Sequence, residues 1–124
     1  MKTRIAIVED NEDNRMLLDA LLSDLHEIDE YPDGVVGLAG IEASPPDVVL
    51  LDISLPKMTG TEVLARMRAN PALQGIPVIA LTAHAMPDDR ESFLAQGFDA
   101  YVSKPIIDES ILFDAITQLL AARA

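Results

Sequence analysis

The stretch from Asp47 to Gly60 constrains the fold most strongly. It reads D-V-V-L-L-D-I-S-L-P-K-M-T-G, so four consecutive apolar residues, Val48 to Leu51, run without polar alternation into Asp52. Such a run of β-branched and aliphatic side chains is typical of a strand buried on both faces of a parallel sheet. An ionised carboxylate at the end of a buried strand is costly unless a partner compensates it, which favours a chemical role for Asp52. The alternative, a helix cap, fits less well because Pro56 and Gly60 indicate a loop.

Predicted strands and helices alternate along the chain. The strands are expected at 4–8, 26–31, 48–51, 78–81 and 99–103. The helices are expected from a cap at Asn11 to about Leu25, over 35–43, from Thr59 to before Pro71, over 87–96, and after a cap at Asp108. Five repeats of this alternation with short connections predict an α/β fold, a doubly wound parallel sheet flanked by five helices.

Composition limits the class of protein. The 124 residues, 49% of them hydrophobic, suit a single domain over 1–124 with its own core. The chain has no cysteine and no signal peptide or membrane span in its sequence, so we expect a cytoplasmic protein. Its net charge of −12 argues against binding nucleic acid or an anionic membrane, and favours divalent cations and basic patches on partner proteins.

Polar side chains gather at the carboxyl ends of the predicted strands, where doubly wound sheets bind their ligands. These side chains are Glu9, Asp10, Asp52, Thr82 and Lys104. Neighbouring carboxylates repel one another, so the three acids need a cation in addition to Lys104. All-oxygen ligands favour Mg²⁺, with Mn²⁺ as an alternative ion. Asp52 could then act as a nucleophile that takes up a phosphoryl group and forms an aspartyl phosphate.

The chain resembles the response-regulator receiver domain from end to end. The resemblance lies in the acidic pair Glu9 and Asp10, the acceptor motif from Asp52 to Gly60, T-A-H-A-M from Thr82 to Met86, and Y-V-S-K-P from Tyr101 to Pro105. V-E-D-N-E-D-N near the start and the stretch from Ile76 to Met86 are most similar to stand-alone DivK-type receivers and to the receivers of hybrid kinases. The resemblance implies the flavodoxin-like strand order 2-1-3-4-5.

The resemblance also implies a role for each matching residue. Asp52 would be phosphorylated by a phosphohistidine on a histidine kinase or a histidine phosphotransfer protein. Mg²⁺ would be held by Asp10, Asp52, the backbone carbonyl of Ser54 and, largely through water, Glu9. The phosphoryl-binding and switch residues would be Thr82, Ala83, Lys104 and Tyr101, with a cis peptide bond before Pro105 and with Ser54 and His84 tuning the dephosphorylation rate. For Tyr101 the alternative is a ring at the rim of the sheet that does not move.

The predicted output is protein binding, because no output domain follows the last helix. The resemblance implies a partner face made by the fourth helix, fifth strand and fifth helix, with Phe93, Tyr101, Ile107 and Ile111 on it; ordinary burial is the alternative for these residues. We expect a monomer that can dimerise on phosphorylation, and not an enzyme beyond slow phosphotransfer and autodephosphorylation. The chain begins with Met1 and ends soon after the last helix, which favours a complete protein.

Four other interpretations stay open. An aspartate-nucleophile phosphohydrolase of the haloacid dehalogenase type would use a similar site, but it requires an acid where this chain has Ser54. A flavodoxin shares the architecture, but the acids from Glu9 to Asp13 would repel its phosphate. The chain could also be a receiver cut from a longer hybrid kinase, or a phosphate sink that drains another pathway.

Overall fold

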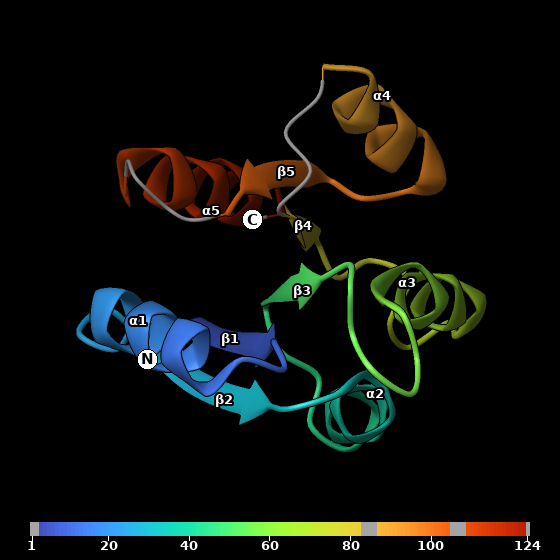
Figure 1. Cartoon of the computed structure of the whole chain (residues 1–124), viewed down its shortest axis with the longest axis horizontal. Helices are drawn as coiled ribbons and strands as arrows, with labels where there is room; N and C mark the ends of the chain where they lie inside the picture. The colour runs from blue at the N-terminus through green and yellow to red at the C-terminus, as the bar shows by residue number, and fades with distance from the viewer. Residues whose placement is uncertain (1–2, 83–86, 105–108, 124) are drawn as a thin grey trace.

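The computed structural model describes residues 3–82, 87–104 and 109–123, which form a five-stranded parallel sheet flanked by helices (Figure 1). The strand order is β2-β1-β3-β4-β5, which confirms the predicted α/β class and the order implied by the resemblance. The elements along the chain are β1 (Thr3–Val8), α1 (Glu12–Leu22), β2 (His26–Tyr31), α2 (Gly34–Ala43), β3 (Val48–Asp52), α3 (Gly60–Ala69), β4 (Val78–Thr82), α4 (Pro87–Gln96), β5 (Ala100–Ser103) and α5 (Glu109–Arg123).

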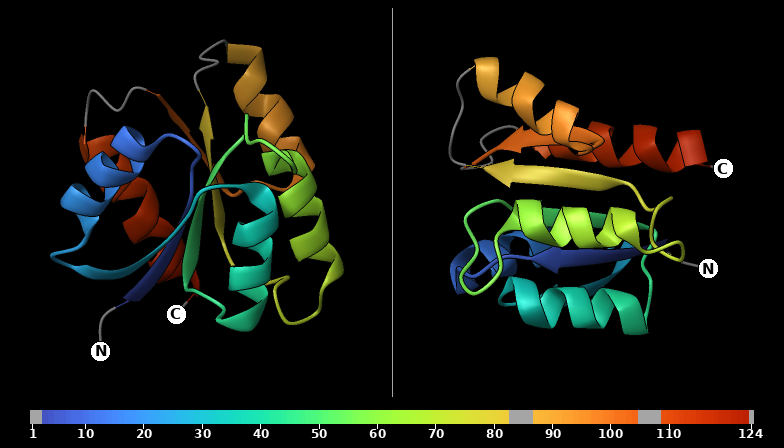
Figure 2. Two further views of the ribbon diagram at one scale, coloured as in Figure 1. Left: turned by 60° about the horizontal axis from the view of Figure 1, so that its bottom comes forward. Right: turned by 90° about the vertical axis from the view of Figure 1, so that its right-hand side faces the viewer.

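Two layers of helices cover the two faces of the sheet (Figure 2). Alternate residues of each strand point to opposite faces, so Ile5 and Ile7 of β1 pack with α1 and α5, whereas Ala6 and Val8 pack with α2 and α3. Every residue of β3 and β4 is buried: the four apolar residues of each strand, as an unbroken apolar run requires, and also the polar residues Asp52 and Thr82 at their ends. Within the described part of the chain, no helix combines the length and the apolar character needed to cross a membrane.

Helix α1 is shorter than predicted. It ends at Leu22 instead of about Leu25, and Leu25 is 70% exposed although it continues the apolar spacing. The N–H of Ser23 still bonds to the Asp19 carbonyl, but the N–H of Leu25 bonds to the Leu22 carbonyl and closes a turn. The turn is needed because His26 already pairs with Thr3 as the first residue of β2. The short connection between α1 and β2 therefore ends the helix before its apolar spacing does.

The register brings the carboxyl ends of neighbouring strands to the same edge of the sheet. Asp52 is the last residue of β3 and lies opposite Leu81, while Thr82 ends β4 opposite Ser103 of β5. Glu9 directly follows β1, where its N–H donates to the carbonyl of Tyr31. The polar residues that follow or end these strands are thus held at one edge by backbone hydrogen bonds.

Arg68 fastens the opposite, amino-terminal edge of β4 and β5. Its guanidinium donates to the carbonyls of Gln74, Ile76 and Gly97 and lies 2.9 Å from Oδ2 of Asp99. We expect Arg68→Met to lower the free energy of unfolding by about 2 kcal/mol, because several of these acceptors would lose a charged donor. Urea denaturation of Arg66→Met, which changes an exposed arginine of the same helix, is the control. Equal effects of the two substitutions would contradict this assignment.

His26 should make stability depend on pH. Its Nδ1 is buried and has no hydrogen-bond partner among the described residues, and burial lowers its pKa below the ordinary value of 6.5. The folded state therefore binds fewer protons at His26 than the unfolded state does. Because protonation of His26 favours the unfolded state, the free energy of unfolding decreases as the pH falls below the ordinary pKa of 6.5. Between pH values of about 7.5 and 5.5 we expect wild type to lose more unfolding free energy than His26→Gln. If urea denaturation gave the same decrease in unfolding free energy with pH for both proteins, His26 would not contribute to the pH dependence of stability.

Candidate functional site

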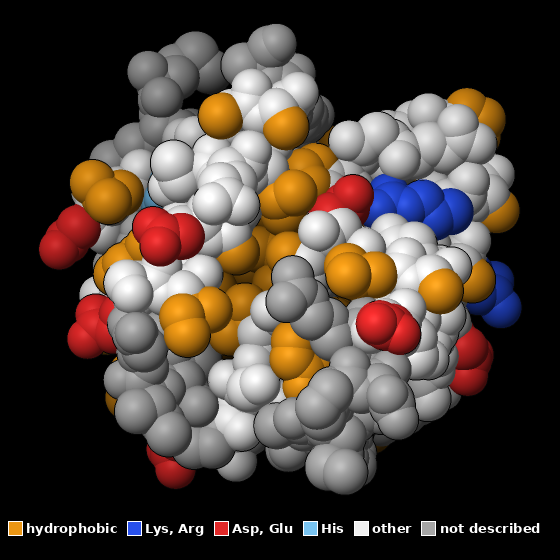
Figure 3. Space-filling model, turned by 90° about the horizontal axis from the view of Figure 1, so that it is seen from above, with side chains coloured by type: hydrophobic (Ala, Val, Ile, Leu, Met, Phe, Trp, Pro, Cys, Tyr) orange, Lys and Arg blue, Asp and Glu red, His pale blue; other side chains and the backbone are white. Residues whose placement is uncertain are grey.

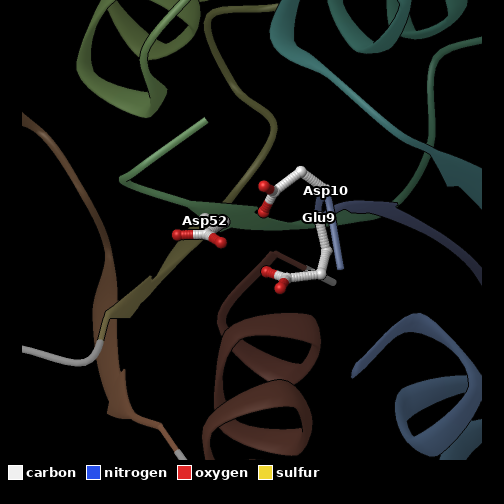
Figure 4. Close-up of side chains that lie close together, drawn as sticks. All are labelled: Glu9, Asp10 and Asp52. Atoms are coloured by element: carbon white, nitrogen blue, oxygen red, sulfur yellow. The ribbon is translucent and has the colours of Figure 1, made fainter. Parts of the chain in front are cut away.

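Three carboxylates meet at the carboxyl edge of the sheet. Glu9 and Asp10 follow β1 and Asp52 ends β3, and one oxygen from each lies within 4.8 Å of the others. Figure 4 shows the three side chains converging on a common space. Glu9 is 0% exposed and Asp52 is 2% exposed, whereas Asp10 is exposed. Two buried acids so close together require compensating positive charge.

Lys104 supplies part of that charge. It follows β5, and its backbone N–H donates to the backbone carbonyl of Thr82 at 2.7 Å. Its Nζ lies 2.8 Å from Oδ2 of Asp52 and 3.2 Å from each carboxylate oxygen of Glu9. With every group ionised, three carboxylates face one ammonium, so negative charge remains uncompensated at the edge where Asp10 is exposed to solvent.

Burial and hydrogen bonding separate the pKa values of the two buried acids. Burial raises the pKa of Glu9 to about 7, and the neighbouring Asp52 adds to the rise while Asn14 and Lys104 oppose it. Burial also disfavours the charge of Asp52, but hydrogen bonding with Glu9, with Lys104 and with the Ser54 N–H outweighs it and lowers the pKa of Asp52. Burial likewise disfavours the charged form of Lys104, yet the two carboxylates raise the pKa of its ammonium. Asp52 is therefore the acid that stays ionised, as a nucleophile requires.

The loop after β3 fixes the orientation of Asp52. The N–H of Ser54 donates to Oδ1 of Asp52 at 2.9 Å, so this oxygen and Oδ2 have different partners. The chain then returns to β3, where the N–H of Gly60 donates to the carbonyl of Ile53. A Cβ at position 60 would lie 2.3 Å from the carbonyl oxygen of Asp52, so only glycine permits this approach.

The same loop contacts the start of α2. Lys57 has a φ of 67°, and its Nζ lies 3.6 Å from Oδ2 of Asp33, which caps α2 through the N–H of Val36. A Cβ at position 34 would overlap the carbonyl of Met58. The loop that carries Ser54 is therefore held against α2 as well as against β3.

The remaining residues singled out from the sequence lie nearby or outside the described residues. Thr82 is buried at the end of β4, and the half-buried ring of Tyr101 on β5 stacks on Phe93 of α4 with centroids 5.8 Å apart. Ser54 and Ile111 are exposed. Five residues with a predicted role in the site, the partner face or a helix cap lie outside the described ranges: Ala83, His84, Pro105, Ile107 and Asp108.

Two residues of α1 contact Glu9 and were not predicted to belong to the site. The Asn14 amide donates to Oε1 of Glu9 at 2.9 Å, and Arg15 donates to the backbone carbonyl of Glu9 at 2.8 Å. Arg15 is half-buried because the first turn of α1 lies over the end of β1. The signal in the sequence was the polar run from Asn11 to Arg15, directly after the acidic pair.

Comparison with known proteins identifies the family. The model of the response regulator receiver domain matches residues 5–117. The chain belongs to this receiver family. Its members are the phosphoacceptor domains of two-component signalling, and the receiver described here has the fold and the acidic edge on which that chemistry depends.

Three relatives place this receiver within its family. The polar-differentiation response regulator DivK of Brucella anthropi is 39% identical over 107 residues, which cover 86% of this chain and 87% of DivK. The sensor protein GacS of Pseudomonas syringae is 33% identical over 112 residues, or 87% of this chain but only 12% of GacS. The receiver domain of the sensor histidine kinase PA1611 from Pseudomonas aeruginosa superposes with a TM-score of 0.88 at 30% identity, over 98% of this chain and 99% of that one.

Proposed function

We propose that Asp52 is the phosphoacceptor, and that it takes its phosphoryl group from a phosphohistidine on a histidine kinase or a histidine phosphotransfer protein. The proposal rests on the surroundings of the Asp52 carboxylate. This group is buried, has a lowered pKa and lies between the Ser54 N–H and the Lys104 ammonium. An oxygen of Asp52 forms a bond to phosphorus while the bond from phosphorus to the histidine nitrogen breaks. The electron pair of that broken bond leaves with the imidazole.

The acidic edge fits Mg²⁺. Its side-chain donors are carboxylate oxygens, which are the ligands that hard divalent cations prefer, and one of them, Asp10, is exposed. We propose that Asp10, Asp52 and the Ser54 backbone carbonyl hold the ion and that Glu9 contributes largely through water. When bound, Mg²⁺ would supply charge that offsets the phosphoryl oxygens. The PA1611 receiver has a magnesium ion coordinated in its active site cleft, which supports this choice, and nothing here favours Mn²⁺.

Lys104 and Thr82 would bind the transferred phosphoryl group. Nζ of Lys104 already contacts Oδ2 of Asp52, so the ammonium is next to the atoms that react. Thr82 ends the neighbouring strand β4, and its hydroxyl would donate to a phosphoryl oxygen. We propose Ala83 as a further phosphoryl contact, Pro105 as the site of a cis peptide bond, and Ser54 and His84 as residues that tune dephosphorylation.

Tyr101 would transmit the change to a partner face on α4, β5 and α5. Its ring is half-buried and rests on Phe93 rather than lying free in solvent, so a movement of the ring would alter the packing of α4. Figure 3 shows hydrophobic side chains gathered between α4 and α5, over β5. Leu94 on α4 and Ile111 on α5 are 39% and 55% exposed, and Ile107 is proposed for the same face. We propose that a downstream protein binds there, or a second copy of the phosphorylated chain.

The phosphohydrolase alternative is less well supported than the signalling role. Ser54 stands where such an enzyme requires a second acid. We propose that turnover is limited to slow phosphotransfer and autodephosphorylation. The match to GacS favours a second candidate, a receiver that works as a module of a longer sensor kinase.

The proposal is tested by intact mass after incubation with acetyl phosphate. We expect the wild-type chain to gain a single phosphoryl group when Mg²⁺ is present and none when EDTA replaces it. If the adduct is too short-lived, beryllofluoride replaces acetyl phosphate and its Mg²⁺-dependent binding is measured. Equal labelling with and without Mg²⁺ would contradict the metal assignment, and no response to either reagent would contradict the phosphoacceptor role.

A further inference from the structure

The buried carboxylate of Glu9 is held from two sides. Asn14 Nδ2 donates to its Oε1 at 2.9 Å from α1, and Lys104 Nζ lies 3.2 Å from both of its oxygens after β5. Glu9 is 0% exposed, so water cannot replace either donor without a rearrangement of the site. Asn14 therefore holds Glu9 independently of Lys104, the residue that would bind the phosphoryl group.

The first turn of α1 fixes the position of Asn14. Asn11 caps the helix and accepts the backbone N–H of Asn14 through its Oδ1 at 2.9 Å. The next residue, Arg15, donates to the Glu9 carbonyl at 2.8 Å, and its Nε lies 4.0 Å from Glu30 of β2. Because the helix start is fastened to both β1 and β2, the Asn14 amide occupies a defined place beside Glu9.

We infer that Asn14 is a positioning residue that orients Glu9 for Mg²⁺ binding. This inference rests on the proposed function of the site. With Asn14 in place, one Glu9 oxygen is shared between two donors and the plane of the carboxylate is set. Without it, Lys104 is the remaining side-chain donor to Glu9 within the described ranges, so the carboxylate turns toward Lys104 and the orientation set by Asn14 is lost. Groups that orient metal-binding carboxylates typically change metal affinity when they are removed.

The test measures Mg²⁺ affinity in Asn14→Leu, which keeps a side chain of similar size but removes the donor. We expect about tenfold weaker Mg²⁺ binding, followed by the shift of backbone amide resonances during a titration. Labelling by acetyl phosphate should slow at low Mg²⁺ and recover close to the wild-type rate at saturating Mg²⁺. Asn14→Gln keeps the amide and should retain most of the affinity, and Asn14→Ala replaces Asn14→Leu if the leucine prevents folding.

A double-mutant cycle with Glu9→Ala separates positioning from a general effect on α1. If Asn14 acts through Glu9, Asn14→Leu should have no further effect on Mg²⁺ affinity in the Glu9→Ala protein. An equal loss in both backgrounds, or an Asn14→Leu affinity within twofold of wild type, would overturn the inference. Failure of the wild-type chain to bind Mg²⁺ would instead overturn the proposed function, so the two failures are distinguishable.

Discussion

Asp52→Asn is expected to abolish phosphorylation. The substitution replaces an anionic oxygen with a neutral amide of the same size, so the nucleophile is lost while the shape of the site is kept. Lys104 keeps Glu9 as its partner, and the repulsion between the Glu9 and Asp52 carboxylates is removed. We therefore expect the variant to be at least as stable as wild type and to gain no phosphoryl group from acetyl phosphate. Intact mass and urea denaturation measure the two effects.

Asp47→Asn is the matched control for this prediction. Asp47 precedes the same strand, β3, at the opposite edge of the sheet, where its carboxylate accepts the N–H of Arg4 at 2.8 Å. The same change of charge is made there without touching the acidic edge, so labelling should remain at the wild-type level. Labelling of Asp52→Asn at a comparable rate would show that the acceptor lies elsewhere.

Gly60→Ala is expected to damage both stability and phosphorylation. The added Cβ would lie 2.3 Å from the Asp52 carbonyl oxygen and 2.9 Å from Cα of Ile53, and both contacts are with backbone that cannot move aside cheaply. We expect the free energy of unfolding to fall by about 3 kcal/mol, in the range of severe overpacking. The loop from Ile53 to Gly60 also contains Ser54, whose N–H orients the Asp52 carboxylate. A shift of this loop should therefore slow the phosphorylation of the folded protein by acetyl phosphate. Urea denaturation and the labelling rate test the two parts separately.

Gly75→Ala provides the control for an added methyl group. A Cβ at Gly75 would meet nothing within 4 Å, so we expect stability within about 0.5 kcal/mol of wild type and an unchanged labelling rate. Similar losses in both variants would mean that the close approach of Gly60 to β3 has no special importance. If Gly60→Ala lowered the free energy of unfolding but left the labelling rate unchanged, the position of the loop would have no influence on phosphorylation of Asp52.

The order of elements was predictable because this sheet is buried on both faces. The unbroken apolar runs in β3 and β4 identify central strands, and their spacing leaves room for one helix between them. The end of α1 was predicted wrongly, since Leu25 continues the apolar spacing but lies exposed in the turn before β2. Apolar periodicity alone does not show where a neighbouring strand must begin.

The convergence of the acids with Lys104 was predictable from topology, because the carboxyl ends of parallel strands share an edge. The contacts from Asn14 and Arg15 were not predictable in this way. They depend on how α1 is rotated above the end of β1, and a polar residue in the first turn of a helix is equally consistent with exposure to solvent. The approach of Gly60 to Asp52 likewise depends on the path of a loop that the sequence marks only as irregular.

Locating the phosphoryl group on the wild-type chain tests the central claim most directly. Borohydride reduces an acyl phosphate to an alcohol, so a phosphorylated aspartate becomes homoserine and can be found by peptide mass mapping. After labelling with acetyl phosphate and Mg²⁺, we expect homoserine at position 52 and at no other aspartate. Homoserine at another position, or a stable phosphoryl group on a histidine or hydroxyl side chain in place of it, would contradict the assignment of Asp52.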